Sequence, residues 1–162
     1  MTLTLLAWLV AIPLLGGLTG LRTMTPIAVL CWFSWIGHLD VFGSWAAWTG
    51  SGISVSVFTL LALGELIGDK LPKTPARTSA FPLIARIIFG GLVGAIAAKG
   101  LAGSPLEGAL LGGLSAVAGA FLGFHVRQWL VKEKNCRDWY IASAEDALTI
   151  LLSVLAMGIV TG

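Results

Sequence analysis

The segment PLIARIIFGGLVGAIAA, residues 82–98, decides the fold class of this protein. Arg86 is its only charged residue, and the remainder is apolar or glycine. A helix needs about 20 largely apolar residues to cross the hydrocarbon core of a bilayer, which is roughly 30 Å thick. Pro82 suits the first turn of such a helix, because the backbone N–H that proline lacks is not needed there. The segment therefore predicts a transmembrane helix.

The composition of the whole chain agrees with this prediction. Of its 162 residues, 57% are hydrophobic and only 11% are charged, whereas soluble domains carry about 25% charged residues. Lipid must therefore cover most of the protein surface. The 21 glycines indicate the same class, because glycine weakens isolated helices in water but lets membrane helices approach closely. We expect one all-α transmembrane domain over residues 1–162.

Several functional classes receive little support from the sequence. A net charge of +2 is too small to indicate nucleic-acid binding. Cys31 and Cys136 have no CxxC or histidine spacing typical of a metal site. The chain contains no HExxH, GxSxG or P-loop motif. We therefore expect no metal and no cofactor, and we assign no catalytic residues.

Six apolar segments are predicted to form a polytopic helix bundle. They are residues 3–21, 26–37, 54–70, 82–98, 106–126 and 141–160. The second segment is short for a bilayer span unless the residues up to about Phe42 contribute to it. The alternative has five spans, with residues 3–37 forming one long helix that is broken near Arg22–Pro26.

The distribution of basic residues favours six spans over five. Loops 71–81 and 127–138 are basic, loop 38–53 contains no Lys or Arg, and loop 99–105 contains one Lys. Basic loops stay on the cytoplasmic side, so we expect the first two inside, the other two outside, and both termini outside. Arg22 then belongs inside as well, whereas a five-span chain would hold it within a helix at considerable cost.

Six spans would give three helices to each half of the chain, residues 1–80 and 81–162, entering the membrane from opposite sides. This is the arrangement of an inverted-topology duplication. Similarity between the two halves is weak, so the duplication stays an open alternative.

Small residues recur every four positions along several of the predicted helices. The series are Gly16 and Gly20; Gly64 and Gly68; Gly90 and Gly94; Gly108, Gly112, Ala116 and Ala120; and Gly119 and Gly123. This spacing makes one face of a helix flat. It predicts tight packing within one bundle or within a homo-oligomer, with glycines that line a narrow pore as the alternative.

Charged residues gather at the predicted cytoplasmic ends of the spans. Most of them suit their positions, because bases favour helix C-termini and acids favour the first turn of a helix. Ser143 and the two acids after it also fit a capping arrangement at the start of the last span. We treat four such residues as secondary candidates for a site: Lys70, Arg127, Glu145 and Asp146.

Three charged residues do not suit their own helices. Glu65 and Asp69 are like charges four positions apart, and they lie at a helix C-terminus, which disfavours anions. Arg86 is a cation near a helix N-terminus. Mutual pairing in a water-accessible pocket, with Arg22 or Arg127 nearby, would resolve all three. Buried pairing rarely adds stability over apolar packing, so we predict an ion or substrate site at Glu65, Asp69, Arg86 and Arg22.

The order of these motifs resembles a known bacterial membrane family. The motifs are Gly20-Leu21-Arg22 with Pro26; Glu65-x-x-x-Asp69-Lys70-x-Pro72; Arg86 with Gly90 and Gly94; and Glu145-Asp146-Ala147-Leu148. Over nearly its whole length the chain resembles the family catalogued as domain of unknown function 4126. The resemblance implies a multi-pass protein of the bacterial inner membrane, and it carries no assigned activity.

The sequence leaves three functional hypotheses. The leading one is a small transporter or channel-like permease, in which Glu65 accepts a proton or cation and Arg86 is its counter-ion. The second is a structural or accessory membrane protein that oligomerises through its glycine faces. The third is an enzyme that acts on lipid headgroups at the inner interface, with Arg22, Arg86 and Arg127 holding a phosphate and Glu65 or His125 as the base. The expected partners are membrane lipid, a second copy of the chain and an unidentified solute or ion.

Overall fold

The computed structural model describes residues 7–70, 78–134 and 136–162. All regular secondary structure in these residues is helical. Six α-helices are described, together with two short helical turns, the π-helical η1 and the 3-10 helix η2. In chain order the elements are η1 (Ala7–Ala11), α2 (Ile12–Leu21), α3 (Met24–Trp35), η2 (Ala47–Gly50), α4 (Gly52–Gly68), α5 (Ala80–Gly100), α6 (Pro105–Lys132) and α7 (Asp138–Thr161).

The six α-helices match the six predicted apolar segments in order, and the all-α prediction is confirmed. Helices α5, α6 and α7 are each long and apolar enough to cross a membrane. Residues Trp8–Leu21, Met24–Trp35 and Gly52–Gly68 form shorter apolar helices. The structure thus supports three spans by length and composition, and six spans and the inverted duplication stay predictions. The start of the first predicted segment and most of the predicted loop 71–81, with Pro72, lie outside the described residues.

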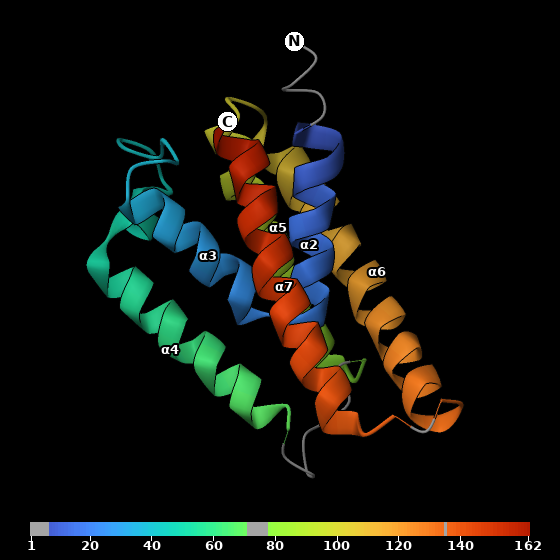
Figure 1. Ribbon diagram of the computed structural model, residues 1–162. Helices are drawn as coiled ribbons and strands as arrows, with labels where there is room; N and C mark the ends of the chain where they lie inside the picture. The colour runs from blue at the N-terminus through green and yellow to red at the C-terminus, as the bar shows by residue number, and fades with distance from the viewer. Residues whose placement is uncertain (1–6, 71–77, 135) are drawn as a thin grey trace.

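Successive helices run in alternating directions along the bundle (Figure 1). One end carries the C-terminus, the turn between α5 and α6, and the connection from α3 to α4. At the opposite end α4 finishes, α5 begins, and α6 joins α7. We call these the outer end and the inner end, after the membrane topology that the sequence predicts.

The helical structure is interrupted between α2 and α3, where only Arg22 and Thr23 separate the two helices. Arg22 has an extended backbone that ends α2. Pro26 then falls in the first turn of α3, where a missing N–H does no harm. Helix α3 runs back towards the outer end at an angle to α2 (Figure 1). Residues 12–35 therefore form two helices that are broken near Arg22, as both the six-span and the five-span alternatives expect, and α3 does not continue along the axis of α2.

The small-residue faces hold α2, α5 and α6 together at backbone distance. A methyl group at Gly94 of α5 would overlap the carbonyl oxygen of Gly108 on α6, and one at Gly16 of α2 would overlap that of Gly112. A methyl group at Gly20 would overlap the α6 backbone at Ala116. The prediction of tight packing within one bundle is confirmed for these helices.

Helix α4 lies at the edge of the bundle and packs mainly against α3 and η2 (Figure 1). Gly64 and Gly68 have no other atom within 4 Å of the position that a Cβ would take. The predicted small-residue face of α4 therefore does not contact another helix in the described part of this chain.

Two predicted helix boundaries were wrong, and both errors concern charged residues. Helix α7 begins at Asp138 rather than at residue 141, so Glu145 and Asp146 lie about two turns inside it rather than in its first turn. Helix α6 continues to Lys132, so Arg127 is more than one turn from its end. In both cases the helix extends beyond the apolar segment into polar residues, because backbone hydrogen bonding does not depend on side-chain hydropathy.

We expect Gly94→Ala to lower the free energy of unfolding by about 1–3 kcal/mol, because the added methyl group must push α5 and α6 apart. Gly64→Ala is the matched control, since that position is open and alanine favours a helix by up to about 1 kcal/mol. Unfolding of the purified protein by SDS in detergent micelles, followed by circular dichroism, measures both. Equal stability of the two variants would contradict the tight contact.

Candidate functional site

Arg22 lies at the centre of a cluster of charged side chains at the break between α2 and α3. It is fully buried. Its Nε donates to Asp146 Oδ1 of α7 at 2.7 Å, and its Nη1 donates to the carboxylate of Asp69, which caps the end of α4. Its Nη2 lies 3.7 Å from Glu145 Oε2 and has no hydrogen-bond acceptor among the described residues. One guanidinium thus holds carboxylates from two helices.

Arg127 of α6 binds the same carboxylates from the other side. Its Nη1 lies 3.0 Å from Asp69 Oδ2 and 3.9 Å from Glu145 Oε2. Its Nε and Nη2 each donate to the carboxylate of Asp138 at 2.8 Å, which makes a bidentate salt bridge across the connection from α6 to α7. Asp138 was not among the predicted site residues. Its position could have been inferred, because a short connection brings the end of one helix close to the start of the next.

Lys70 completes the described part of the cluster, with its Nζ 2.9 Å from Asp146 Oδ2. Ion pairs connect Asp138 with six further charged residues of four helices and the residues that follow them. We call these six, without Asp138, the charged network: Arg22, Asp69, Lys70, Arg127, Glu145 and Asp146. Asp146 lies about 12 Å along α7 from its start at Asp138, at 1.5 Å per residue. The network therefore lies inside the bundle, nearer to the inner end.

Glu65 caps the N-terminus of α3, although it belongs to α4. Its Oε1 accepts the backbone N–H of Thr23 at 2.8 Å, and its Oε2 accepts that of Met24 at 2.7 Å. No side chain of α3 makes an N-terminal capping hydrogen bond of its own. The first N–H groups of a helix need acceptors, and the positive end of the helix dipole favours an anion. The carboxylate of Glu65 supplies both the hydrogen-bond acceptors and the negative charge.

Arg86 of α5 caps the C-terminus of α2. Its Nε donates to the carbonyl oxygen of Gly20, one of the last carbonyls of α2, at 3.0 Å. Its Nη1 donates to the Pro82 carbonyl oxygen at 3.2 Å, and its Nη2 lies 3.9 Å from Glu65 Oε1. A cation at the C-terminal end of α2 suits the dipole of that helix. Arg86 and Glu65 together bridge the two sides of the helix break.

The three residues that do not suit their own helices therefore suit others. Glu65 lies at the wrong end of α4 but at the right end of α3, and Arg86 lies at the wrong end of α5 but at the right end of α2. Asp69 is held by the guanidinium groups of Arg22 and Arg127. The predicted proximity of these charges is thus present, with Arg86 near Glu65 and with Arg22 and Arg127 at Asp69, in two separate arrangements.

The described residues give no support to metal chemistry or to a histidine base in this cluster. Among them, no group of three His, Cys, Asp or Glu side chains lies close enough to hold a metal ion. His125 is exposed, and its Nδ1 lies 2.7 Å from the carbonyl oxygen of Phe121 in its own helix. It does not join the charged network.

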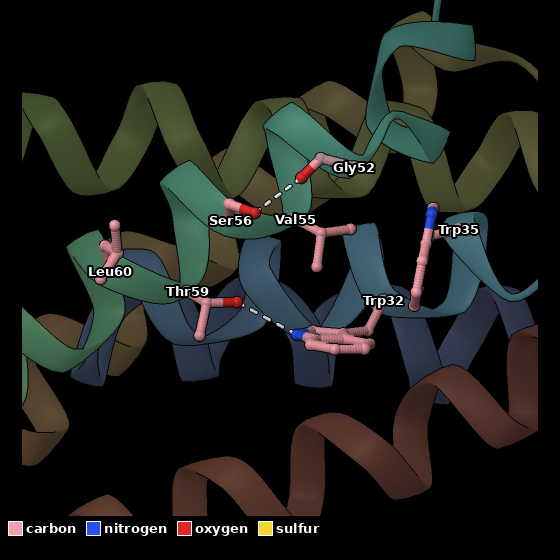
Figure 2. A pocket seen from close by; sticks show the side chains of 7 residues that line it. All are labelled: Trp32, Trp35, Gly52, Val55, Ser56, Thr59 and Leu60. Atoms are coloured by element: carbon pink, nitrogen blue, oxygen red, sulfur yellow. Dashed lines mark hydrogen bonds between the residues drawn. The ribbon is translucent and has the colours of Figure 1, made fainter.

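Two pockets lined by described residues lie between helices. One, of about 400 Å³, lies between α6 and α7, and Arg127 and Glu145 are part of its lining, so it borders the charged network. The other, of about 510 Å³, lies between α3 and α4 (Figure 2). There the rings of Trp32 and Trp35 face α4, and Trp32 Nε1 donates to Thr59 Oγ1 at 3.1 Å. The lining of this second pocket contains no charged side chain, so it has no direct link to the network.

We expect Arg22→Met to lower the free energy of unfolding by about 3–5 kcal/mol, because it leaves Asp69 and Asp146 as carboxylates without their buried cation. Lys99→Met is the control, since Lys99 lies in the last turn of α5, away from the network, and its interaction with the helix dipole contributes less than about 1 kcal/mol. SDS unfolding measures both variants. A loss below 1 kcal/mol for Arg22→Met would show that the network adds little to stability.

Comparison with known proteins agrees with the motifs that the sequence presents. Searches of curated proteins and of solved structures find no match. Residues 9–159 match the model of the family described as Domain of unknown function (DUF4126), so the match covers α2 to α7 and every residue of the charged network. The resemblance inferred from the motifs is therefore confirmed, and the chain belongs to the DUF4126 family.

Proposed function

We propose that this protein is a small permease of the bacterial inner membrane that carries an ion or small solute through a site at the charged network. The observation that carries the proposal is the break between α2 and α3, which is capped by Glu65 and Arg86 from two other helices. Interrupted helices whose ends face a substrate or ion are a recurring design of secondary transporters.

A break of this kind is costly inside a membrane. Each backbone N–H or C=O without a partner costs several kcal/mol in a medium without water. A continuous helix would satisfy these groups by itself, whereas this chain recruits Glu65 and Arg86 to satisfy them. Charged residues within membrane helices are expensive and usually functional. The interrupted backbone and the charges that cap it are therefore explained if they serve binding.

Within this proposal Glu65 is the group that exchanges partners. Asp69 contacts two guanidinium groups, whereas Glu65 contacts neutral backbone N–H groups and lies 3.9 Å from Arg86. Its carboxylate is therefore less strongly bound to cations than that of Asp69. A proton or cation that binds Glu65 would compete with the N-terminus of α3, and Arg86 would act as the counter-ion.

Helix α4 is the element through which binding at Glu65 would act. It carries Glu65 and Asp69, and it packs mainly against α3 and η2 rather than against the glycine-packed α2, α5 and α6. A change at Glu65 would thus alter the contact between a peripheral helix and a tightly packed core. Arg22 Nη2, a buried donor with no acceptor among the described residues, gives the same region capacity for a further polar partner.

A structural role is the second candidate, and a specific observation favours it. Glu65 and Arg86 each complete a helix end, so the cluster also explains how an interrupted helix stays folded. In this case the charges would hold the helices together, and the open face of α4 at Gly64 would contact a second copy. Ion flux would then be absent, and loss of Glu65 would affect folding or assembly alone.

Proton flux in liposomes tests the proposal. Purified protein is reconstituted into vesicles that contain a trapped pH-sensitive dye, and a potassium gradient with valinomycin sets the membrane potential. We expect flux above that of empty vesicles, and at least about a tenfold reduction in Glu65→Gln, in line with the loss of a group that binds the ion directly. Asp69→Asn provides a second variant in case Glu65→Gln folds poorly.

Glu107→Gln is the matched control, because Glu107 is an exposed carboxylate in the first turn of α6 at the outer end. Its flux should equal that of the unaltered protein. Circular dichroism and gel filtration establish that each variant is folded. Folded Glu65→Gln with unaltered flux would overturn the proposed site. Absence of proton, sodium and potassium flux, together with aggregation of Glu65→Gln, would favour the structural role.

A further inference from the structure

The pocket between α6 and α7 owes its existence to the early end of α2. Leu21, the last residue of α2, is the only residue of that helix in the lining. One residue earlier, Gly20 packs against the backbone of α6 at Ala116 and Ala120. Beyond Leu21, α6 and α7 continue towards the inner end without α2 between them. The space of about 400 Å³ lies in this region.

The pocket opens towards the side of the bundle that faces lipid. Its lining comes almost entirely from α6 and α7, which are both long and apolar enough to cross a membrane. Leu122, Val126 and Leu148 line it and are between 45% and 67% exposed. Inside a bilayer, such a surface is in contact with hydrocarbon. An acyl chain is therefore the chemistry that fits the walls.

The charged side chains of this pocket lie in the middle of its lining, with apolar residues on both sides of them. Arg127 and Glu145 are the charged residues of its lining, and both belong to the charged network. After about one further turn of each helix, at the inner end, comes the connection from α6 to α7, where the basic side chains of Lys132, Lys134 and Arg137 are all exposed. Basic residues at this position attract anionic lipid headgroups.

Aromatic side chains mark the same region as an interfacial one. Lys134 Nζ lies 5.2 Å from the centre of the Trp129 ring, and the rings of Trp139 and Tyr140 stack at 4.0 Å. All three aromatic residues are exposed. Tryptophan and tyrosine concentrate at the depth of the lipid headgroups. The apolar pocket and the basic connection are therefore stacked in the order that a phospholipid presents its chain and its phosphate.

We propose that the pocket binds one acyl chain of an anionic phospholipid, whose phosphate contacts Lys132, Lys134 and Arg137. The bound chain covers Arg127 and Glu145 on their membrane-facing side and keeps water away from that side of the network. The lipid is thus a specific ligand of the protein. This site is independent of the proposed transport, because it follows from the shape of the pocket beyond the end of α2 and from the charge of the connection between α6 and α7, whether or not an ion is carried.

Native mass spectrometry of the purified protein in detergent tests this assignment. Phosphatidylglycerol and phosphatidylcholine with identical acyl chains are titrated separately, and the fraction of protein with bound lipid is measured. We expect phosphatidylglycerol to bind about a hundredfold more tightly, because it alone has the net negative charge that the three basic residues attract. Replacing Lys132, Lys134 and Arg137 together by Ala should weaken it by about a hundredfold, because each basic residue near a lipid surface contributes about fivefold. Binding of phosphatidylcholine should hardly change.

Ala144→Trp tests the chain-binding part of the pocket. Ala144 lines the pocket, so an indole ring there should displace the lipid. Ala147→Trp is the matched control, since Ala147 is also exposed on α7 but does not line the pocket. Equal lipid binding by these two variants, or no preference for phosphatidylglycerol, would overturn the assignment. A dimer that Ala144→Trp dissociates, without any bound lipid, would also overturn it and identify a second copy as the occupant. None of these readouts depends on ion flux.

Discussion

The contacts across the break between α2 and α3 are the constraint on which the rest of this structure depends. Two helix ends face each other inside an apolar bundle, and backbone groups there must find partners. Glu65 and Arg86 provide partners of the correct sign from helices far away in the sequence. Their positions fix where α4 and α5 must lie relative to α2 and α3. Arg22 lies at the break itself and forms ion pairs with Asp69 and Asp146, so these two carboxylates also lie at the break.

The glycine faces and the charged network stabilise different parts of the bundle. Helices α2, α5 and α6 approach at backbone distance through Gly16, Gly94, Gly108 and Gly112, which leaves no room for side chains between them. Helices α4 and α7 contribute carboxylates that meet the arginines at the inner end. Dispersion forces between flat faces and ion pairs at one level of the bundle thus act on different helices.

Much of this arrangement could be predicted from the sequence, because apolar length and small-residue spacing depend on each helix alone. The six helices and the small-residue faces at Gly94 and Gly108 follow from such local patterns, whereas the contact between these two faces is given by the structure. The sequence also singled out Glu65 and Arg86 as residues unsuited to their own helices. Their partners could not be predicted, since backbone groups at Thr23 and Gly20 carry no signal in the side-chain pattern.

The depth of the charged network has an electrical consequence. Asp146 lies about 12 Å along α7, a helix of about 36 Å at 1.5 Å per residue, so the network lies about one third of the way along it from the inner end. In a membrane crossed by α7, a charge moved between the network and the inner solution would traverse about one third of the transmembrane voltage. That corresponds to about 0.8 kcal/mol per elementary charge at 100 mV. Most of the voltage drop would fall across the glycine-packed part of the bundle, between the network and the outer end.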